Sequence, residues 1–228
     1  MSQHQQNVTF ASNGGTGHGY LVLPEAASGP GLVLIQEWWG LTEHIIDVAR
    51  RLAAEGFVAM APDLYGGTTT HDSAEAQRLR RELPDDRAAR DLAGAVDHLL
   101  GHTAVTSRTV GCIGFCMGGG FVLSMAAQQG DRVSAAVPFY GLPSVEVDYS
   151  GLRADVQGHY ALRDKGITPR AVDAELAKID EQSDVSVTRF DYNAGHAFHN
   201  EGLTDAYEPE AAALAWQRAM AFLHDTVR

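Results

Sequence analysis

Cysteine is scarce in this sequence, and its scarcity excludes two classes of protein. Only two of the 228 residues are cysteines, Cys112 and Cys116. A secreted disulfide framework uses more, and the chain offers no second Cys or His pair at the spacing of zinc ligands. We therefore expect neither structural disulfides nor a bound metal.

Positive charge and long apolar runs are also scarce. The 17 basic residues face 29 acidic ones, so the net charge is −12 at pH 7 and the isoelectric point is about 5.1. A field of that sign repels nucleic acid and anionic membrane surfaces. No stretch approaches the roughly 18 uninterrupted apolar residues of a membrane-spanning helix. The sequence thus predicts no nucleic-acid partner and no membrane association.

The rest of the composition, 45% apolar and 20% charged, is that of an ordinary globular protein. A chain of this length can bury a self-sufficient core, and no change in composition divides it, so we expect one domain over residues 1–228. Met1 to Gln6 is polar and lacks the basic and apolar regions of a secretion signal. A reducing cytoplasm is therefore the simplest expected location, with a mature secreted chain as the alternative. The oligomeric state is left open, and a monomer is compatible with the sequence.

Short apolar runs alternate with stretches of helical periodicity. Strands are expected at Val8–Phe10, Tyr20–Leu23, Leu32–Gln36, Phe57–Ala61, Thr109–Ile113, Val133–Phe139, Ala154–Leu162 and Val185–Asp191. Helices are expected after Thr42 as far as Gly56 and at Ser73–Leu83, Arg87–Leu100, Met117–Gln129, Pro169–Glu181 and Pro209–Asp225. A glycine-rich turn at Asn13–Gly19 would join the first two strands. This alternation predicts an α/β fold with a mostly parallel, doubly wound sheet and flanking helices.

One strand–turn–helix segment carries a chemical motif. Gly114-Phe115-Cys116-Met117-Gly118 follows an apolar strand and opens a helix. This is the G-x-nucleophile-x-G elbow of α/β-hydrolases, with cysteine in the serine position. The small residues let strand and helix approach closely, and the helix N-terminus favours a thiolate and a developing oxyanion. The alternative is a tight turn with Cys116 as a small buried hydrophobe, which is our interpretation of Cys112.

An α/β-hydrolase chain carries its nucleophile, acid and base in that order, and this order selects two further residues. Asp164 stands at the end of the seventh expected strand, and His196 follows the last one. We therefore predict a triad of Cys116, His196 and Asp164. The alternatives are a solvated carboxylate at Asp164 and a base at His199. His159 lies within a strand, where we expect it to pack or to form hydrogen bonds.

Four segments carry a resemblance to a known family. They are Gln36-Glu37-Trp38-Trp39-Gly40, Ala61-Pro62-Asp63-Leu64-Tyr65-Gly66-Gly67, Gly114-Phe115-Cys116-Met117-Gly118-Gly119 and Gly195-His196-Ala197-Phe198. In sequence and order they resemble the signature blocks of the dienelactone hydrolase family, across nearly the whole chain. The resemblance implies an α/β-hydrolase fold, a triad at Cys116, His196 and Asp164, no cofactor, and Glu37 close to the thiol.

The implied reaction is hydrolysis of a small ester or lactone through an acyl-thioester. The backbone N–H groups of Met117 and Trp38 are expected to hold the oxyanion. Glu37 would disfavour the thiolate by like-charge repulsion. The resemblance to the family further implies a resting thiol that is activated as substrate binds. A carboxylate that only binds the loop backbone is the alternative for Glu37.

The substrate is where the sequence departs from the family. Family members hold a substrate carboxylate with two arginines, but those positions are Asn200 and Ala74 here. Nearby arginines on the Ser73–Leu83 helix are expected to form a solvated face. We expect an aromatic-walled pocket that includes Asn200, with ordinary core packing as the alternative for each ring: Trp38, Trp39, Tyr65, Phe115 and Tyr140.

Two other functions compete. Nucleotide binding would need G-x-G-x-x-G between a strand and a helix, and the sequence lacks it. A non-hydrolytic thiol sensor or ligand-binding protein would keep the fold and use Cys116 differently. Loss of ester hydrolysis on alkylation of Cys116 would favour the enzyme.

Overall fold

The protein is described by a computed structural model that covers residues 6–12 and 14–228. It divides into two compact units, one that extends to Val110 and includes Arg228, and one that spans Gly111–Val227. Because the described residues begin at Gln6, the polar segment at Met1 to Gln6 lies almost entirely outside them. The single domain expected over residues 1–228 stays a prediction.

The elements follow the predicted alternation. The strands are β1 (Val8–Ser12), β2 (Gly15–Val22), β3 (Gly29–Ile35), β4 (Val58–Pro62), β5 (Val105–Phe115), β6 (Val133–Phe139), β7 (Asp155–Ala161) and β8 (Val187–Tyr192). The helices are α1 (Glu43–Ala54), α2 (Ser73–Glu82), α3 (Asp85–Gly101), α4 (Met117–Gln129), α5 (Pro169–Gln182) and α6 (Pro209–Thr226), with a short 3₁₀ helix at Gly130–Arg132. Hydrogen-bonded strands follow the order β1-β2-β4-β3-β5-β6-β7-β8, and β5 contributes residues to both units. This largely parallel sheet with flanking helices confirms the predicted fold class.

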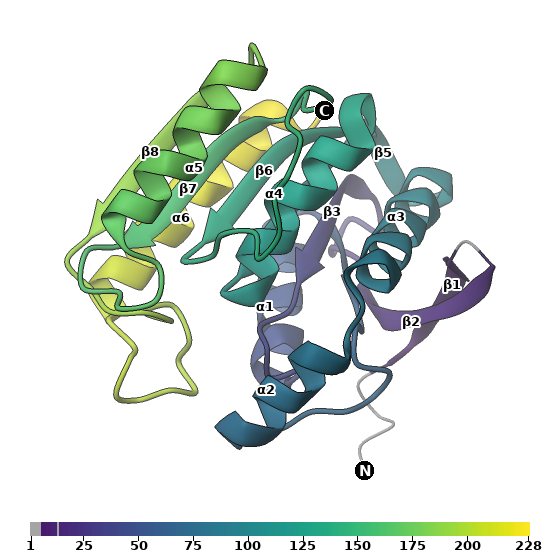
Figure 1. Cartoon of the computed structure of the whole chain (residues 1–228). Helices are drawn as coiled ribbons and strands as arrows, with labels where there is room; N and C mark the ends of the chain where they lie inside the picture. Colours follow the sequence, from purple (N-terminus) through teal and green to yellow (C-terminus); the bar gives the residue numbers. More distant parts are fainter. Residues whose placement is uncertain (1–5, 13) are drawn as a thin grey trace. The chain divides into compact units, whose positions relative to one another are not determined.

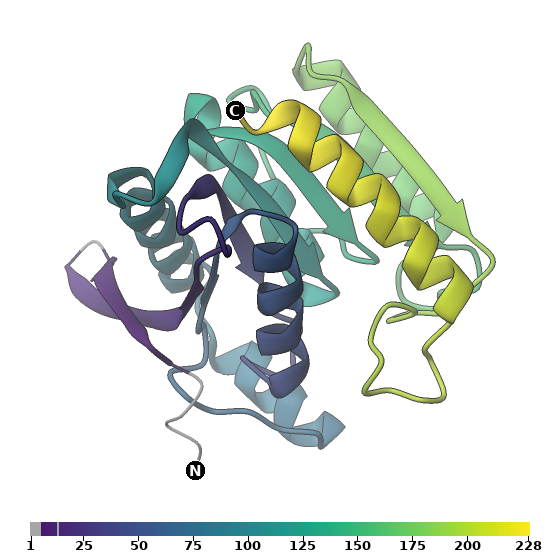
Figure 2. The same cartoon turned by 180° about the vertical axis from the view of Figure 1, so that it is seen from behind.

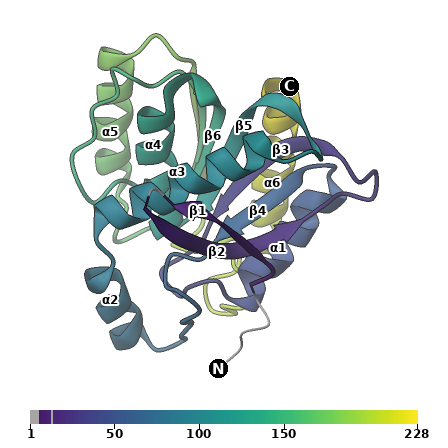
Figure 3. The same cartoon turned by 90° about the vertical axis from the view of Figure 1, so that its right-hand side faces the viewer.

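In the first unit, β2 pairs antiparallel with β1 and β4, and β3 runs parallel to β4. Helix α3 packs against β1, β3 and β4, while α1 packs against β2 and β4 from the other face (Figures 1 and 3). The apolar residues that recur at helical spacing in α1 are all buried, as expected for an amphipathic helix: Ile45, Ile46, Val48, Ala49 and Leu52. The chain leaves α1 through Gly56, whose φ of 97° belongs to the left-handed region that favours glycine.

The expected turn at Asn13–Gly19 is wrong over most of its length. Strand β2 already begins at Gly15, and Asn13 lies outside the described residues. A Cβ on Gly17 would lie 2.4 Å from the Phe10 ring, and one on Gly19 would lie 2.6 Å from the Ala61 carbonyl oxygen. Glycine is therefore needed here for close packing within the sheet rather than for a turn.

In the second unit, β6, β7 and β8 are parallel. Helices α4 and α5 cover one face and α6 covers the other (Figures 1 and 2). Strand β6 is almost wholly buried, as expected for a parallel strand covered on both faces. Because β7 and β8 run parallel and end at Ala161 and Tyr192, the loops that follow them leave the same edge of the sheet. Within the described part of the chain, no helix is long and apolar enough to cross a membrane.

Candidate active site

Cys116 occupies a strained turn between β5 and α4. Its φ of 54° and ψ of −116° lie outside the regions that residues with a side chain usually adopt. The turn is held by a hydrogen bond from Cys116 N–H to the Phe139 carbonyl (3.0 Å) and one from Gly119 N–H to the Cys116 carbonyl (3.0 Å). A Cβ on Gly114 would lie 2.4 Å from the Gly118 carbonyl oxygen. The elbow therefore depends on glycine at position 114, and it leaves Cys116 half-buried at the N-terminus of α4.

Gly141 supports the same turn from the chain that follows β6. A Cβ at this position would lie 2.0 Å from the Cys116 carbonyl oxygen and 2.8 Å from the Gly120 nitrogen. Sequence reasoning did not select Gly141, because it is 25 residues beyond the elbow and no local pattern marks it. Only the packing of β6 beside the turn shows that this position has no room for a side chain.

The structure brings Cys116, His196 and Asp164 together. His196 Nε2 lies 3.1 Å from Cys116 Sγ, and His196 Nδ1 lies 2.6 Å from Asp164 Oδ2. The other predicted candidate for the base, His199, is almost fully buried and its ring stacks on Phe115 and Trp216. Of the two histidines, His196 is therefore the one that lies between the thiol and the carboxylate.

Two backbone amides fix Asp164 in this arrangement. Asp164 Oδ1 accepts hydrogen bonds from Gly166 N–H (2.8 Å) and Ile167 N–H (2.9 Å), which leaves Oδ2 for His196. The Asp164 side chain is only 1% exposed. Sequence reasoning missed these two amides, although an aspartate two residues before a glycine is a recognisable Asx-turn pattern.

The electrostatics favour the protonated form of the His196 imidazole beside Cys116. Burial lowers the pKa of His196, but its hydrogen bonds to Asp164 and Cys116 outweigh burial and raise the pKa to about 10. Burial likewise opposes the charged form of Asp164. The hydrogen bonds from His196, Ile167 and Gly166 nevertheless hold the pKa of that carboxyl below its usual value. The N-terminus of α4 adds a partial positive charge at Cys116.

Aromatic side chains surround this group. The Tyr140 ring lies 5.2 Å from both the His196 and the Phe198 rings, and Tyr140 has a positive φ of 37°. Phe115 is fully buried. Asn200 is also buried, and its Oδ1 accepts a hydrogen bond from Gly202 N–H. Of the predicted pocket residues, Tyr140 thus packs its ring against His196.

Four other predicted site residues belong to the first unit. Glu37, Trp38 and Trp39 form the turn after β3, where Glu37 is 1% exposed and the two indole rings lie 4.9 Å apart. Tyr65 is buried after β4. Their predicted roles at the thiol stay predictions. On α2, Arg78 is ion-paired with Glu75 and Glu82 at the surface, which confirms the expected solvated face.

Two residues assigned to structure rather than chemistry behave as expected. Cys112 is completely buried in β5, and burial raises the pKa of its thiol. His159 is completely buried in β7, where Nδ1 lies 2.8 Å from Tyr192 Oη and Nε2 lies 3.0 Å from Gln157 Oε1. Among the described residues, no group of three or more His, Cys, Asp or Glu side chains could hold a metal ion.

Known proteins resemble this chain over nearly its whole length. The dienelactone hydrolase family profile matches residues 18–227. Protein usf of Aquifex pyrophilus is 33% identical over 228 residues, which cover 96% of this chain and 98% of that protein. A carboxymethylenebutenolidase of Rhodococcus opacus is 29% identical over 87% of this chain and 82% of its own. A solved dienelactone hydrolase-like promiscuous phosphotriesterase from metagenomic libraries shares 26% identity over 97% of both chains, with a TM-score of 0.84. In sequence and in fold, the chain belongs to the dienelactone hydrolase family.

Proposed function

We propose that this protein hydrolyses a small ester or lactone through an acyl-thioester on Cys116. The chain is a hydrolase of the dienelactone hydrolase family. The observation that carries the finer proposal is the continuous contact from Cys116 Sγ through His196 to Asp164, at a strained turn that opens a helix. The family's name and that of its Rhodococcus relative indicate a lactone among the substrates of such enzymes.

In the proposed reaction, the Cys116 thiol gives its proton to His196 Nε2, while His196 Nδ1–H donates to Asp164 Oδ2. The thiolate attacks the acyl carbon, so a C–S bond forms and the carbonyl π electrons move to oxygen. The Met117 backbone N–H, next after the nucleophile, donates to that oxyanion. The C–O bond of the ester then breaks, and His196 Nε2–H protonates the leaving oxygen.

In deacylation, water is the nucleophile and the Cys116 thiolate is the leaving group. His196 removes a proton from water, the resulting hydroxide attacks the thioester carbon, and the C–S bond breaks. The thiolate regains its proton from His196, and the net reaction consumes one water to give an acid and an alcohol. For a lactone, both groups stay in one hydroxy acid. Because Tyr140 packs against His196 and Asn200 stands where the family has an arginine, we propose a substrate with an uncharged acyl group.

The test is to trap the covalent intermediate. The protein is mixed with p-nitrophenyl acetate and, separately, with a panel of simple lactones, quenched in acid, and the adduct is located by peptide mass. The expected adduct lies on Cys116. Cys116→Ala should abolish hydrolysis, and Cys116→Ser should reduce it strongly because a serine hydroxyl needs more assistance from the base than a thiol does.

Cys112→Ala is the matched control, because Cys112 is completely buried in β5 and its Sγ lies 3.4 Å from the Ala135 carbonyl oxygen. It should keep both the adduct and the turnover. An acyl group on any residue other than Cys116, or full turnover in Cys116→Ala, would contradict the mechanism. A Cys116 that is alkylated readily in a protein that hydrolyses none of the panel would favour the thiol sensor instead.

A further inference from the structure

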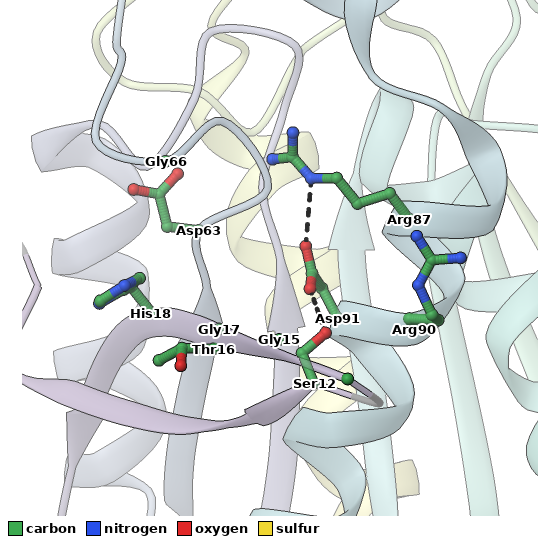
Figure 4. A pocket seen from close by; sticks show the side chains of 11 residues that line it. Ser12, Gly15, Thr16, Gly17, His18, Asp63, Gly66, Arg87, Arg90 and Asp91 are labelled. Carbon is green, nitrogen blue, oxygen red and sulfur yellow. Dashed lines mark hydrogen bonds and ion pairs between the residues drawn. The ribbon is translucent and has the colours of Figure 1, made fainter.

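The first unit contains a polar cavity that the proposed hydrolysis does not use. It has a volume of about 490 Å³, within the range of small-molecule sites. It is lined by the end of β1, the start of β2, the segment after β4 and the first turns of α3, with all members in the first unit (Figure 4). The lining residues that matter below are Ser12, Gly15, Thr16, Asp63, Arg87 and Asp91.

The cavity exists because β2 presents glycine toward α3. Gly15 is paired with Ser12 and Gly17 with Phe10, and directly opposed residues in an antiparallel pair point to the same face. Ser12 Oγ donates to Asp91 Oδ1 on α3, so this is the face that α3 covers. The Phe10 ring fills the space above Gly17, whereas a Cβ on Gly15 would meet only the Ser12 carbonyl oxygen, at 3.5 Å. The space above Gly15 is therefore open.

The start of β2, which forms the floor of the cavity, also offers backbone hydrogen-bonding groups. Strand β2 is paired with β4 only from Gly19 to Val22, and Asp63 N–H donates to the His18 carbonyl just beyond the end of β4. Because backbone groups alternate between the two edges of a strand, the N–H and carbonyl of Thr16 face the side that β4 no longer occupies. They supply one donor and one acceptor at the cavity.

The walls carry charges of both signs in equal number. Arg87 Nη2 donates to the Leu64 carbonyl (2.7 Å), and its Nε lies 3.5 Å from Asp91 Oδ2, which leaves the Nη1 hydrogens without a partner in the described residues. Figure 4 shows Asp63 on the opposite wall from Arg87. Arg90, the second arginine of the lining, is ion-paired with Asp86 on α3, and Arg87 lies beside Asp91. The Asp63 carboxylate accepts hydrogen bonds from Tyr65 N–H and Gly67 N–H. No arginine of the lining is therefore without a nearby carboxylate, and a simple anion would gain no net attraction.

We propose that this cavity binds a small, neutral, polyhydroxylated molecule such as a sugar or a cyclic polyol. A hydroxyl group both donates and accepts, so neighbouring hydroxyls can donate to Asp91 and accept from Arg87 and the Thr16 N–H. A simple anion would satisfy the guanidinium but leave the carboxylates opposed to it. The balance of donors and acceptors, more than their number, selects this class of ligand.

The test is an NMR titration of the ¹⁵N-labelled full-length protein with myo-inositol, D-ribose and D-glucose, each used separately. At least one should shift the amide signals of Gly15, Thr16 and Gly17 along a single saturable curve. Inorganic phosphate at the same concentrations should leave these signals unmoved. Shifts that stay linear for all three neutral probes, or a stronger saturable response to phosphate, would overturn the proposal.

Two variants locate the binding. Gly15→Leu fills the space above the floor without a backbone clash and should weaken binding at least tenfold, while hydrolysis at Cys116 is retained. The matched control is Gly101→Leu, since a Cβ on Gly101 has no atom within 4 Å. Arg87→Gln removes the guanidinium and should also weaken binding at least tenfold, which keeps the test decisive if Gly15→Leu fails to fold. Parental affinity in either folded cavity variant would refute the assignment.

Discussion

The buried imidazole of His159 makes a sharp prediction about stability in acid. Nε2–H donates to Gln157 Oε1 and Nδ1 accepts from the Tyr192 hydroxyl, so the neutral ring has both nitrogens satisfied. The ring also stacks on Phe139, with centroids 4.4 Å apart. Burial, and to a lesser degree the charge of Arg218, lowers the pKa of His159 from 6.5 to about 3. A proton on Nδ1 would point a second donor at the Tyr192 hydroxyl inside the core.

The direction in which stability changes with pH depends on whether the folded or the unfolded state binds the proton more tightly. Below pH 6.5 the unfolded chain protonates His159 while the folded protein does not, so stability falls as the pH drops from about 6.5 toward about 3. At pH 4 the difference corresponds to about 3 kcal/mol of unfolding free energy at 1.36 kcal/mol per pH unit. Other acidic groups titrate over the same range, so the comparison must be with a variant that lacks only this proton site.

His159→Gln is that variant, because glutamine is neutral throughout and can still form hydrogen bonds. Urea unfolding followed by tryptophan fluorescence at pH 7 and pH 4 gives the free energy of each protein. The parent should lose about 3 kcal/mol more than the variant between the two pH values. The comparison uses the change with pH, so a uniform destabilisation of the variant does not affect it. Parallel losses in the two proteins would refute the reasoning.

Three further predictions concern the site. In Asp164→Asn the alkaline limb of kcat/KM should move at least one pH unit toward neutral, because the carboxylate helps to raise the pKa of His196 to about 10. The value of kcat/KM should fall on the order of 10⁴-fold, and an unshifted limb would contradict the role of Asp164. In Gly141→Ala the new Cβ overlaps the Cys116 carbonyl oxygen. The variant should therefore be less stable by roughly 1–3 kcal/mol, and its Cys116 should react more slowly with iodoacetamide. A melting temperature and an alkylation rate equal to those of the parent would refute this prediction. If Glu37 gates the thiol, Glu37→Gln should lower the pH at which Cys116 reacts and change turnover, and a variant that matches the parent in both would end that hypothesis.

The order of secondary structure was predictable because each element signals itself locally. The helix expected at Met117–Gln129 has the same bounds as α4. The strand expected at Leu32–Gln36 begins three residues after β3 begins and ends one residue after it ends. Strand β5 is longer than expected, because its first residues, Val105 to Arg108, are polar or half-exposed and show no apolar run. Ser107 Oγ accepts a hydrogen bond from Gly31 N–H on β3, a contact between residues 76 positions apart. Periodicity cannot detect a strand that is defined by its partner in this way.

The candidate nucleophile, acid and base could be chosen from the sequence, because their order along the chain follows from the order of the strands that carry them. Two histidines three residues apart remained as candidates for the base, and which of them faces the thiol depends on how the loop after β8 packs. The His199 ring is enclosed by Phe115 and Trp216, whereas the His196 ring lies between Cys116 and Asp164. The glycines before Tyr20 and at position 141 were likewise decided in three dimensions. Their need for glycine comes from atoms of distant segments, and a local sequence pattern does not contain that information.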